Sequence, residues 1–140
     1  MARIIAIDYG KVRVGLAVSD PLQLIANGLK TVGNAELFTF LHDYVKREQV
    51  EAMVVGLPKS LQNRDTDFTS EVNKFVRKLK KEFPAVEVHC VDERFTSKIA
   101  MDTILRSGVK KVKRKNKALI DEVSAIIILQ SYLEQKENRN

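Results

Sequence analysis

One short stretch decides the fold of this chain: RIIAIDYG, residues 3–10. Its aliphatic run, Ile4 to Ile7, is typical of a strand buried in a sheet. Asp8 ends this run, and Tyr9-Gly10 indicates a turn. An ionised carboxylate beside an apolar core costs free energy unless a partner, such as a hard divalent cation, pairs with it. Asp8 therefore predicts a metal site if the rest of the chain brings further carboxylates to it.

The composition is that of a globular protein. The chain has 140 residues, of which 44% are hydrophobic and 30% charged, so we expect a single domain spanning residues 1–140. No apolar run approaches the roughly 18 residues of a membrane-spanning helix, and we expect no signal peptide and no membrane partner. Cys90 is the only cysteine, and its apolar neighbours predict a small core residue. A reducing cytoplasm is the expected location.

Positive charge is concentrated in one segment. The formal net charge is +6, and no acid occurs from Thr103 to Ile120. The basic residues of that segment are Arg106, Lys110, Lys111, Lys113, Arg114, Lys115 and Lys117. Such a cluster is a candidate phosphate-binding segment of a nucleic-acid-binding protein. The alternative is a solvated loop that binds nothing.

The order of strands and helices predicts an α/β fold. The predicted strands are residues 3–10, 12–19, 29–32, 52–58 and 86–91. The predicted helices begin after Asn34, after Asp65 or Thr66, after Thr96 or Ser97, and after Asn116. The last one reaches about Gln135 and is apolar nearly all round, which indicates burial. Three meandering strands followed by alternating helices and strands favour a mixed sheet with helices on its faces.

Three acids can meet at one edge of this sheet. Sites in parallel α/β sheets form at the carboxyl ends of strands, where Asp8 ends the first strand and Asp92-Glu93 the fifth. Asp121 lies near the start of the last helix. Neighbouring carboxylates repel each other unless a cation is bound, and carboxylates around two Mg²⁺ ions suit phosphodiester hydrolysis.

Each of these acids also has a structural interpretation. Asp8 could form the turn at the strand end. Asp92-Glu93-Arg94 could be a salt bridge that caps the next helix, and Asp121 could be a first-turn acid favoured by the helix dipole. A phosphate-binding loop over Gly10 to Gly15 is excluded, because Leu16 and Ala17 stand where that motif needs Lys and Ser or Thr.

Four segments together resemble the YqgF family of bacterial proteins. They are IDYGKVRVGLAVSD at residues 7–20, VGLP at 55–58, VDERFTS at 91–97, and KALIDE at 117–122 with ILQSYL at 128–133. Members are described as Holliday junction resolvases and as pre-16S rRNA processing nucleases with an RNase H-like fold. The resemblance implies a five-stranded mixed sheet of three antiparallel strands followed by two parallel ones, with helices on both faces.

The resemblance also implies the site. Asp8, Glu93 and Asp121 would be the catalytic, metal-binding acids, with Asp8 bridging Mg²⁺ ions or, as a second choice, Mn²⁺. Asp92 is the rival of Glu93, because related resolvases carry the second acid at the end of the fourth strand, where this chain has Gly56-Leu57-Pro58. The residues expected to contact nucleic acid are Lys11, Arg13, Arg94, Lys110, Lys111, Lys113, Arg114, Lys115 and Lys117.

The function implied is metal-dependent cleavage of structured RNA, with the 5′ end of precursor 16S rRNA as the preferred substrate. One alternative is a resolvase of branched DNA, for which junction symmetry favours a homodimer over a monomer. Another is an RNA-binding module without catalysis. An actin-like ATPase needs two such domains, and 140 residues are too few. The sequence shows no obvious aromatic platform for unpaired bases.

Overall fold

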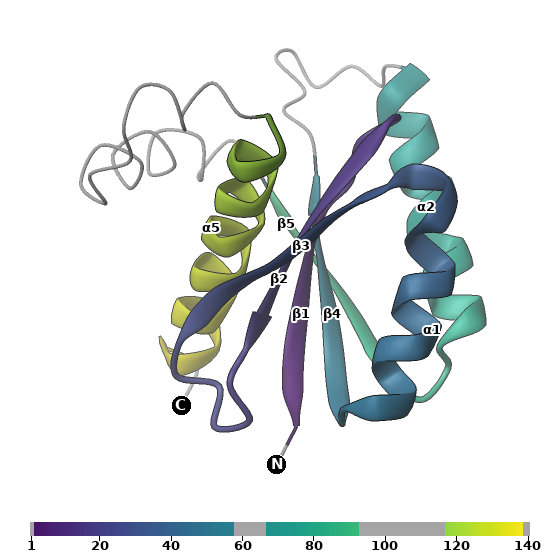
Figure 1. Ribbon diagram of the computed structural model, residues 1–140. Coiled ribbons are helices and arrows are strands. Elements are labelled where there is room, and N and C mark those ends of the chain that lie inside the picture. The colour runs from purple at the N-terminus through teal and green to yellow at the C-terminus, as the bar shows by residue number, and fades with distance from the viewer. Residues whose placement is uncertain (1, 58–66, 93–116, 139–140) are drawn as a thin grey trace.

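The computed structural model describes residues 2–57, 67–92 and 117–138. Five strands form one sheet in the order β3-β2-β1-β4-β5 (Figure 1). Their bounds are β1 Arg3–Asp8, β2 Arg13–Ser19, β3 Ala26–Gly33, β4 Val50–Leu57 and β5 Glu87–Asp92. β1, β2 and β3 pair antiparallel, whereas β4 pairs parallel with both β1 and β5. The predicted mixed sheet is confirmed, and the structure places β4 between β1 and β5.

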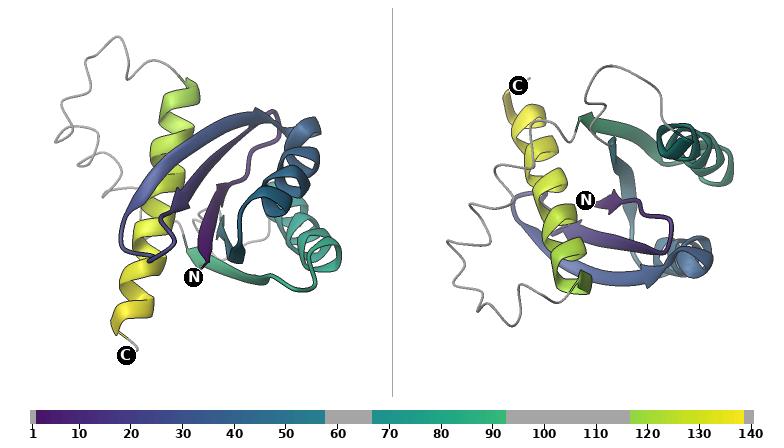
Figure 2. Two further views of the ribbon diagram at one scale, coloured as in Figure 1. Left: turned by 60° about the horizontal axis from the view of Figure 1, so that its bottom comes forward. Right: turned by 90° about the horizontal axis from the view of Figure 1, so that it is seen from above.

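Helices cover both faces of this sheet. α1 (Leu37–Arg47), which follows the short 3-10 helix η1 (Asn34–Glu36), and α2 (Asp67–Glu82) lie on one face. α5 (Lys117–Asn138) crosses the other face (Figure 2). The helix predicted after Thr96 lies outside the described residues. No helix in the described part of the chain is long and apolar enough to cross a bilayer.

The alternation of side chains along the strands divides the core in two. On the α1/α2 face, Ile5 and Ile7 of β1 are fully buried with residues of β2, β4 and the two helices, namely Val14, Leu16, Met53, Val55, Leu37, Leu41, Val72 and Leu79. On the α5 face, Ile4 and Ala6 of β1 pack with Ala17, Ala52, Val54, Ala125, Ile128 and Leu129. Side chains at even positions of β1 therefore belong to the α5 face.

The direction of α5 follows from contacts near its end. Lys136 Nζ lies 3.1 Å from Glu51 Oε2 at the start of β4 and donates a hydrogen bond of 2.7 Å to Gln23 Oε1. The end of α5 is thus at the edge where the parallel strands begin. Its N-terminus lies toward the edge where β1, β4 and β5 end (Figure 1).

Four expectations need correction. The third strand is longer than predicted, because Ala26 already pairs with Ser19. Asn34 is not a helix cap, because it is the first residue of η1, whose N-cap is Gly33; its side-chain amide donates to the Gly10 carbonyl oxygen at 2.7 Å. α5 is not buried all round, since Gln130, Glu134 and Glu137 are exposed. Cys90 is exposed rather than in the core, because it lies on the edge strand β5; partial burial nonetheless raises the pKa of its thiol.

Candidate functional site

The candidate site is the edge of the sheet at which β1 ends. Asp8 is half-buried there, and its even position places it on the α5 face with Ile4 and Ala6. It faces a glycine on the next strand, because its partner in the β1–β2 register is Gly15. A carboxylate at this position lies at the rim of the core and not inside it.

A rigid turn holds the residues that follow Asp8. A Cβ atom at Gly10 would collide with the Arg13 carbonyl oxygen, so this turn requires glycine. Asn34 fixes the turn from the side of α1: its backbone N–H donates to the Val12 carbonyl oxygen at 2.9 Å, in addition to the side-chain bond to Gly10. The end of β1 is therefore held at a defined position relative to the start of α1.

The backbone brings Asp92 and Asp121 toward the same edge. Asp92 is the last residue of β5 and pairs in register with Leu57, the last residue of β4. Asp121 lies close to the N-terminus of α5, the end of the helix directed toward this edge. Glu93 lies outside the described residues. Among the side chains that the structure describes, no three His, Cys, Asp or Glu residues form a metal-binding group.

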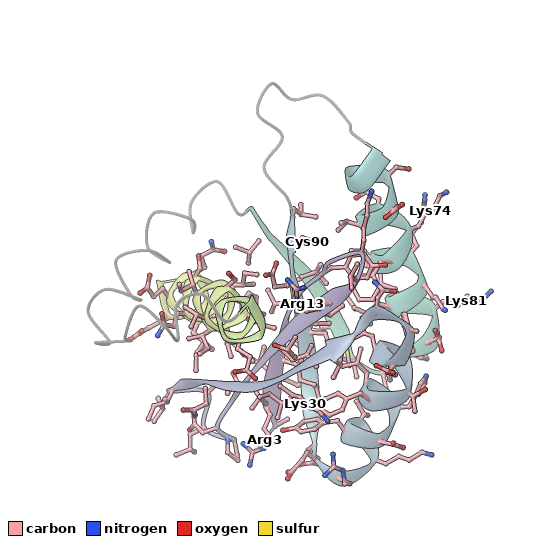
Figure 3. The ribbon with its side chains drawn as sticks, turned by 45° about the horizontal axis from the view of Figure 1, so that its top comes forward. Arg3, Arg13, Lys30, Lys74, Lys81 and Cys90 are labelled. Carbon is pink, nitrogen blue, oxygen red and sulfur yellow. The ribbon has the colours of Figure 1, made fainter. Side chains whose placement is uncertain are left out.

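Two of the predicted phosphate contacts lie near Asp8. Lys11 is exposed in the turn, and Arg13 is exposed at the start of β2. Arg13 shares its side of β2 with Ala17, which packs on the α5 face, and Figure 3 shows it between α5 and α2. Lys117 begins α5, while Arg94 and the basic residues from Lys110 to Lys115 lie outside the described residues.

The orientation of the helices adds positive potential to this edge. α1 and α2 each precede a strand that runs parallel to β1, and α5 runs against β1, so the N-termini of the three described α-helices are directed toward the ends of the parallel strands (Figure 1). Helix N-termini carry partial positive charge and favour anions. The edge therefore combines carboxylates that suit a cation with surroundings that suit phosphate.

A hollow of about 450 Å³ borders this edge on the α1/α2 face. We call it the aromatic hollow, because Tyr9, Phe38 and Phe75 line it together with Asn34, Ala35, Leu37, Glu71, Lys74 and Lys78. Sequence reasoning missed it, because the three rings come from β1's end, α1 and α2. The only sequence signal was the helical spacing of Phe38 and Phe75, which indicated core packing.

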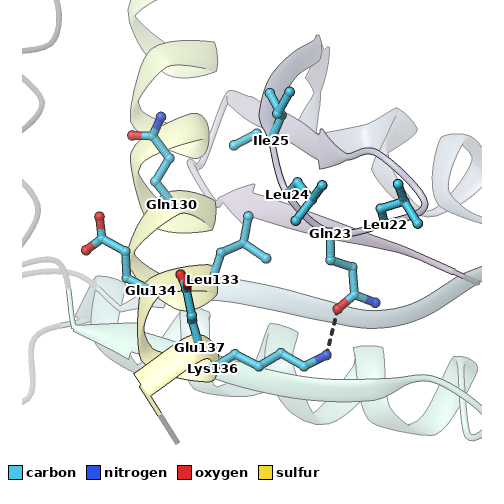
Figure 4. A pocket seen from close by; sticks show the side chains of 10 residues that line it. Leu22, Gln23, Leu24, Ile25, Gln130, Leu133, Glu134, Lys136 and Glu137 are labelled. Atoms are coloured by element: carbon cyan, nitrogen blue, oxygen red, sulfur yellow. Dashed lines mark hydrogen bonds between the residues drawn. The ribbon is translucent and has the colours of Figure 1, made fainter. Parts of the chain in front are cut away.

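A second hollow of about 600 Å³ lies at the opposite edge, between the β2–β3 loop and the end of α5 (Figure 4). Its apolar side includes Leu22, Leu24 and Ile25, all of which are exposed. The Asp20 carboxylate closes the loop by accepting hydrogen bonds from the backbone N–H groups of Leu22, Leu24 and Ile25. These bonds, chiefly the one from Ile25, hold the pKa of Asp20 below its ordinary value.

Comparison with known proteins identifies close relatives by sequence. The model of the RuvX family, described as Holliday junction resolvase, matches residues 2–135. A protein of Bacteroides thetaiotaomicron named "Putative pre-16S rRNA nuclease" is 56% identical over 136 residues, which cover 97% of this chain and 99% of that protein. A protein of the same name from Porphyromonas gingivalis is 51% identical over 137 residues, 98% of this chain and 99% of the relative.

Solved structures match the fold at low sequence identity. T. thermophilus RuvC in complex with Holliday junction substrate superposes with a TM-score of 0.60 at 16% identity, covering 96% of both chains. Fowlpox virus resolvase in complex with substrate Holliday junction DNA gives a TM-score of 0.58 at 13% identity, covering 95% of this chain and 97% of the other. At these identities the likeness concerns the fold alone, and it confirms the predicted RNase H-like architecture.

Proposed function

The chain belongs to the RuvX family, and on this premise we propose that it is a metal-dependent nuclease that processes precursor 16S rRNA. The observation that carries the proposal is the 56% identity, over nearly the full length of both chains, to the Bacteroides thetaiotaomicron protein whose name gives that activity. Nuclease activity agrees with the resolvase description of the family. Work on precursor rRNA also agrees with the cytoplasmic location expected from the sequence.

The acids at the strand ends fit a divalent cation. Asp8 is a half-buried carboxylate at the rim of the sheet, and carboxylate oxygens are the ligands that Mg²⁺ prefers. Glu93 is the second acid that the family resemblance implies, and Asp92 is its rival. We therefore infer that Asp8, Glu93 and Asp121 hold Mg²⁺, with Mn²⁺ as a substitute.

The residues around these acids would position the substrate. When bound, a divalent cation would supply activation of water and stabilisation of the leaving oxygen. Side chains of the protein would hold the nucleic-acid strand. Lys11 and Arg13 are exposed beside Asp8 and suit the phosphates on either side of the scissile bond. Arg94, Lys117 and the basic residues from Lys110 to Lys115 would bind phosphates further along the strand.

A nuclease assay with a matched pair of variants tests this proposal. Asp8→Asn keeps the shape of the side chain and removes its charge, whereas Asp43→Asn makes the same change at an exposed position of α1. Both variants and the wild type are incubated with labelled precursor 16S rRNA in Mg²⁺, in Mn²⁺ and in EDTA. We expect cleavage by the wild type and by Asp43→Asn in either metal, and none by Asp8→Asn or in EDTA.

Resolution of branched DNA is the second candidate, because the matching family is described by that activity. The same assay with a labelled four-way DNA junction separates the two. Cleavage of the junction but not of the rRNA precursor would favour the resolvase, and a homodimer in solution would agree with the two-fold symmetry of a junction. Binding of rRNA without cleavage by any of the three proteins would contradict both candidates and indicate an RNA-binding module.

A further inference from the structure

We propose that the aromatic hollow binds an unpaired base of the substrate strand, beside the edge at which that strand is cleaved. The inference rests on the proposed nuclease function and adds to it a class of substrate. A base inside a duplex is stacked on both sides and cannot enter a concave site, so the hollow would select single-stranded segments or ends. A stacking site of this kind would accept any base. The sequence did not reveal it, because its three aromatic residues are far apart in the chain.

The three rings form a continuous aromatic surface. The rings of Tyr9 and Phe75 are stacked, with centroids 4.2 Å apart and planes inclined by 18°. The rings of Phe38 and Phe75 meet edge to face, with centroids 5.6 Å apart. Phe75 is buried, whereas Tyr9 and Phe38 are only half-buried and line the hollow. Phe75 thus supports two partly exposed rings that line the hollow.

Positive charge lies at the rim of this aromatic surface. Lys74 is exposed on α2 (Figure 3), and the side chain of Lys78, one turn later, is 62% exposed. Lys78 Nζ lies 4.4 Å from the centroid of the Phe38 ring. Among the lining residues that the structure describes, Glu71 is the one acid and Lys74 and Lys78 are the bases, so the formal charge of this set is positive. An aromatic surface flanked by lysines suits a nucleotide, which has a flat base and an anionic phosphate.

The aromatic hollow adjoins the edge of the sheet at which β1 ends, on the opposite face of the sheet from Asp8. Tyr9 directly follows Asp8, so their Cα atoms are about 3.8 Å apart, but Tyr9 packs with the α1/α2 core while Asp8 belongs to the α5 face. A nucleic-acid strand that crosses the end of β1 could place a phosphate at Asp8 and a neighbouring base against Tyr9. The bonds from Asn34 to the turn hold the two positions in a fixed relation.

The size of the hollow agrees with this occupant. Its volume of about 450 Å³ lies within the roughly 300–1,000 Å³ that is usual for small-molecule sites. Sites of that size take a base and its sugar but not a double helix. The competing interpretation, a side chain of a partner protein, predicts no preference between single-stranded and double-stranded nucleic acid.

Binding measurements without metal test the proposal apart from catalysis. The probe is a fluorescein-labelled RNA oligonucleotide, used single-stranded and as a duplex of the same sequence, in EDTA. Tyr9→Leu removes the ring and keeps an apolar side chain, whereas Tyr9→Phe keeps the ring. We expect Tyr9→Leu to weaken binding of the single strand roughly tenfold, the effect of losing one stacked base, and to leave duplex binding within about twofold. Tyr9→Phe should bind both as the wild type does.

Charge variants give a second, independent comparison. Lys74→Ala/Lys78→Ala removes the two lysines of the hollow, and Lys80→Ala/Lys81→Ala removes two exposed lysines of the same helix that do not line it. Both pairs lower the net charge equally, so a general electrostatic effect would be the same for each. A larger loss of single-strand affinity in the first pair supports the hollow.

A fluorescent reporter gives a third readout of binding that does not depend on removing the Tyr9 ring. The chain has no tryptophan, so Phe38→Trp introduces a single one into the wall of the hollow. Single-stranded RNA should quench its emission and duplex RNA should not. Equal single-strand binding by Tyr9→Leu and Tyr9→Phe, together with unquenched emission in Phe38→Trp, would overturn the inference while leaving the nuclease proposal intact. Failure of the wild type to bind or cleave any RNA would overturn the proposed function and this inference with it.

Discussion

Two consecutive polar residues at the end of β2 show how single side chains fix this fold. Ser19 is fully buried, and its hydroxyl oxygen accepts a hydrogen bond from the Ile4 backbone N–H at 2.9 Å and donates one to the Asp20 carbonyl oxygen at 2.9 Å. Asp20 then closes the β2–β3 loop through its three backbone bonds. The residues that end the first segment of family resemblance therefore have structural roles.

Ser19→Ala should destabilise the protein. It leaves the buried N–H of Ile4 without its hydroxyl acceptor, and an unsatisfied buried donor costs roughly 1–3 kcal/mol. The free energy of unfolding in urea measures the loss. Ser70→Ala, at an exposed position of α2, should change it by less than about 0.5 kcal/mol. Equal values for the two variants would show that the Ser19 bond contributes nothing.

Asp20→Asn should weaken the protein at neutral pH more than in acid. Because folding lowers the pKa of Asp20, the ionised carboxylate adds stability above its ordinary pKa of about 3.9, and this stability is lost as the pH falls through the lowered folded-state pKa. The unfolding temperatures of wild type and variant should therefore differ at neutral pH and converge toward about pH 2. Asp43→Asn serves as the control, and a difference that grows in acid would contradict the assignment.

The turn between β1 and β2 connects the core to the candidate site. Gly10 lies in this turn between Asp8 and the exposed residues Lys11 and Arg13. The strands on either side were predicted within two residues, because their apolar runs are unambiguous. The contact that fixes the turn was not predicted, because it comes from Asn34, which is distant in sequence.

Gly10→Ala should cost roughly 1–3 kcal/mol, the usual penalty of forcing extra atoms into a packed site, because the new Cβ would meet the Arg13 carbonyl oxygen. It should also lower nuclease activity, since the turn positions both Asp8 and Lys11. Gly28→Ala is the matched control: its Cβ would lie 3.5 Å from Ile126 Cδ1, an ordinary contact. Urea unfolding and the cleavage assay give the two readouts, and equal effects at both glycines would refute the steric argument.

The long helix α5 joins one half of the core to the candidate site. Its buried residues lie against a part of the sheet lined by Ala6, Ala17 and Ala52, and these small side chains let the helix approach closely. The same helix carries Asp121 near its N-terminus. The packing of α5 on the sheet therefore determines where the backbone of Asp121 lies relative to that of Asp8.

Ile128→Ala should lower the free energy of unfolding by about 2–5 kcal/mol, because Ile128 is 1% exposed and truncating its side chain leaves a cavity. Leu133→Ala, at a half-buried position five residues later, should cost less. Chemical denaturation compares the two. A larger loss at Leu133 would mean that α5 is held mainly by its end and not by its middle.

Metal binding should stabilise the whole molecule. A ligand that binds only the folded state at 100 times its dissociation constant adds about 2.7 kcal/mol. We therefore expect Mg²⁺ to raise the unfolding temperature of the wild type and of Asp43→Asn, but not that of Asp8→Asn. Calorimetry in Mg²⁺ and in EDTA measures this without a substrate. An equal rise in Asp8→Asn would place the metal away from Asp8.

The local pattern of residues predicted the order and type of the described strands and α-helices, the mixed sheet, and Asp8 as an acid at a strand end. It could do so because buried strands and amphipathic helices leave local periodic patterns of apolar residues. Tertiary structure alone decided which residues meet across those elements. The face that Asp8 shares with α5, the bond from Asn34 to Gly10, the exposure of Cys90 on an edge strand, and the aromatic hollow formed by Tyr9, Phe38 and Phe75 all depend on strand order and helix packing. Contacts between residues far apart in the chain leave no local pattern, so no reading of one sequence can supply them.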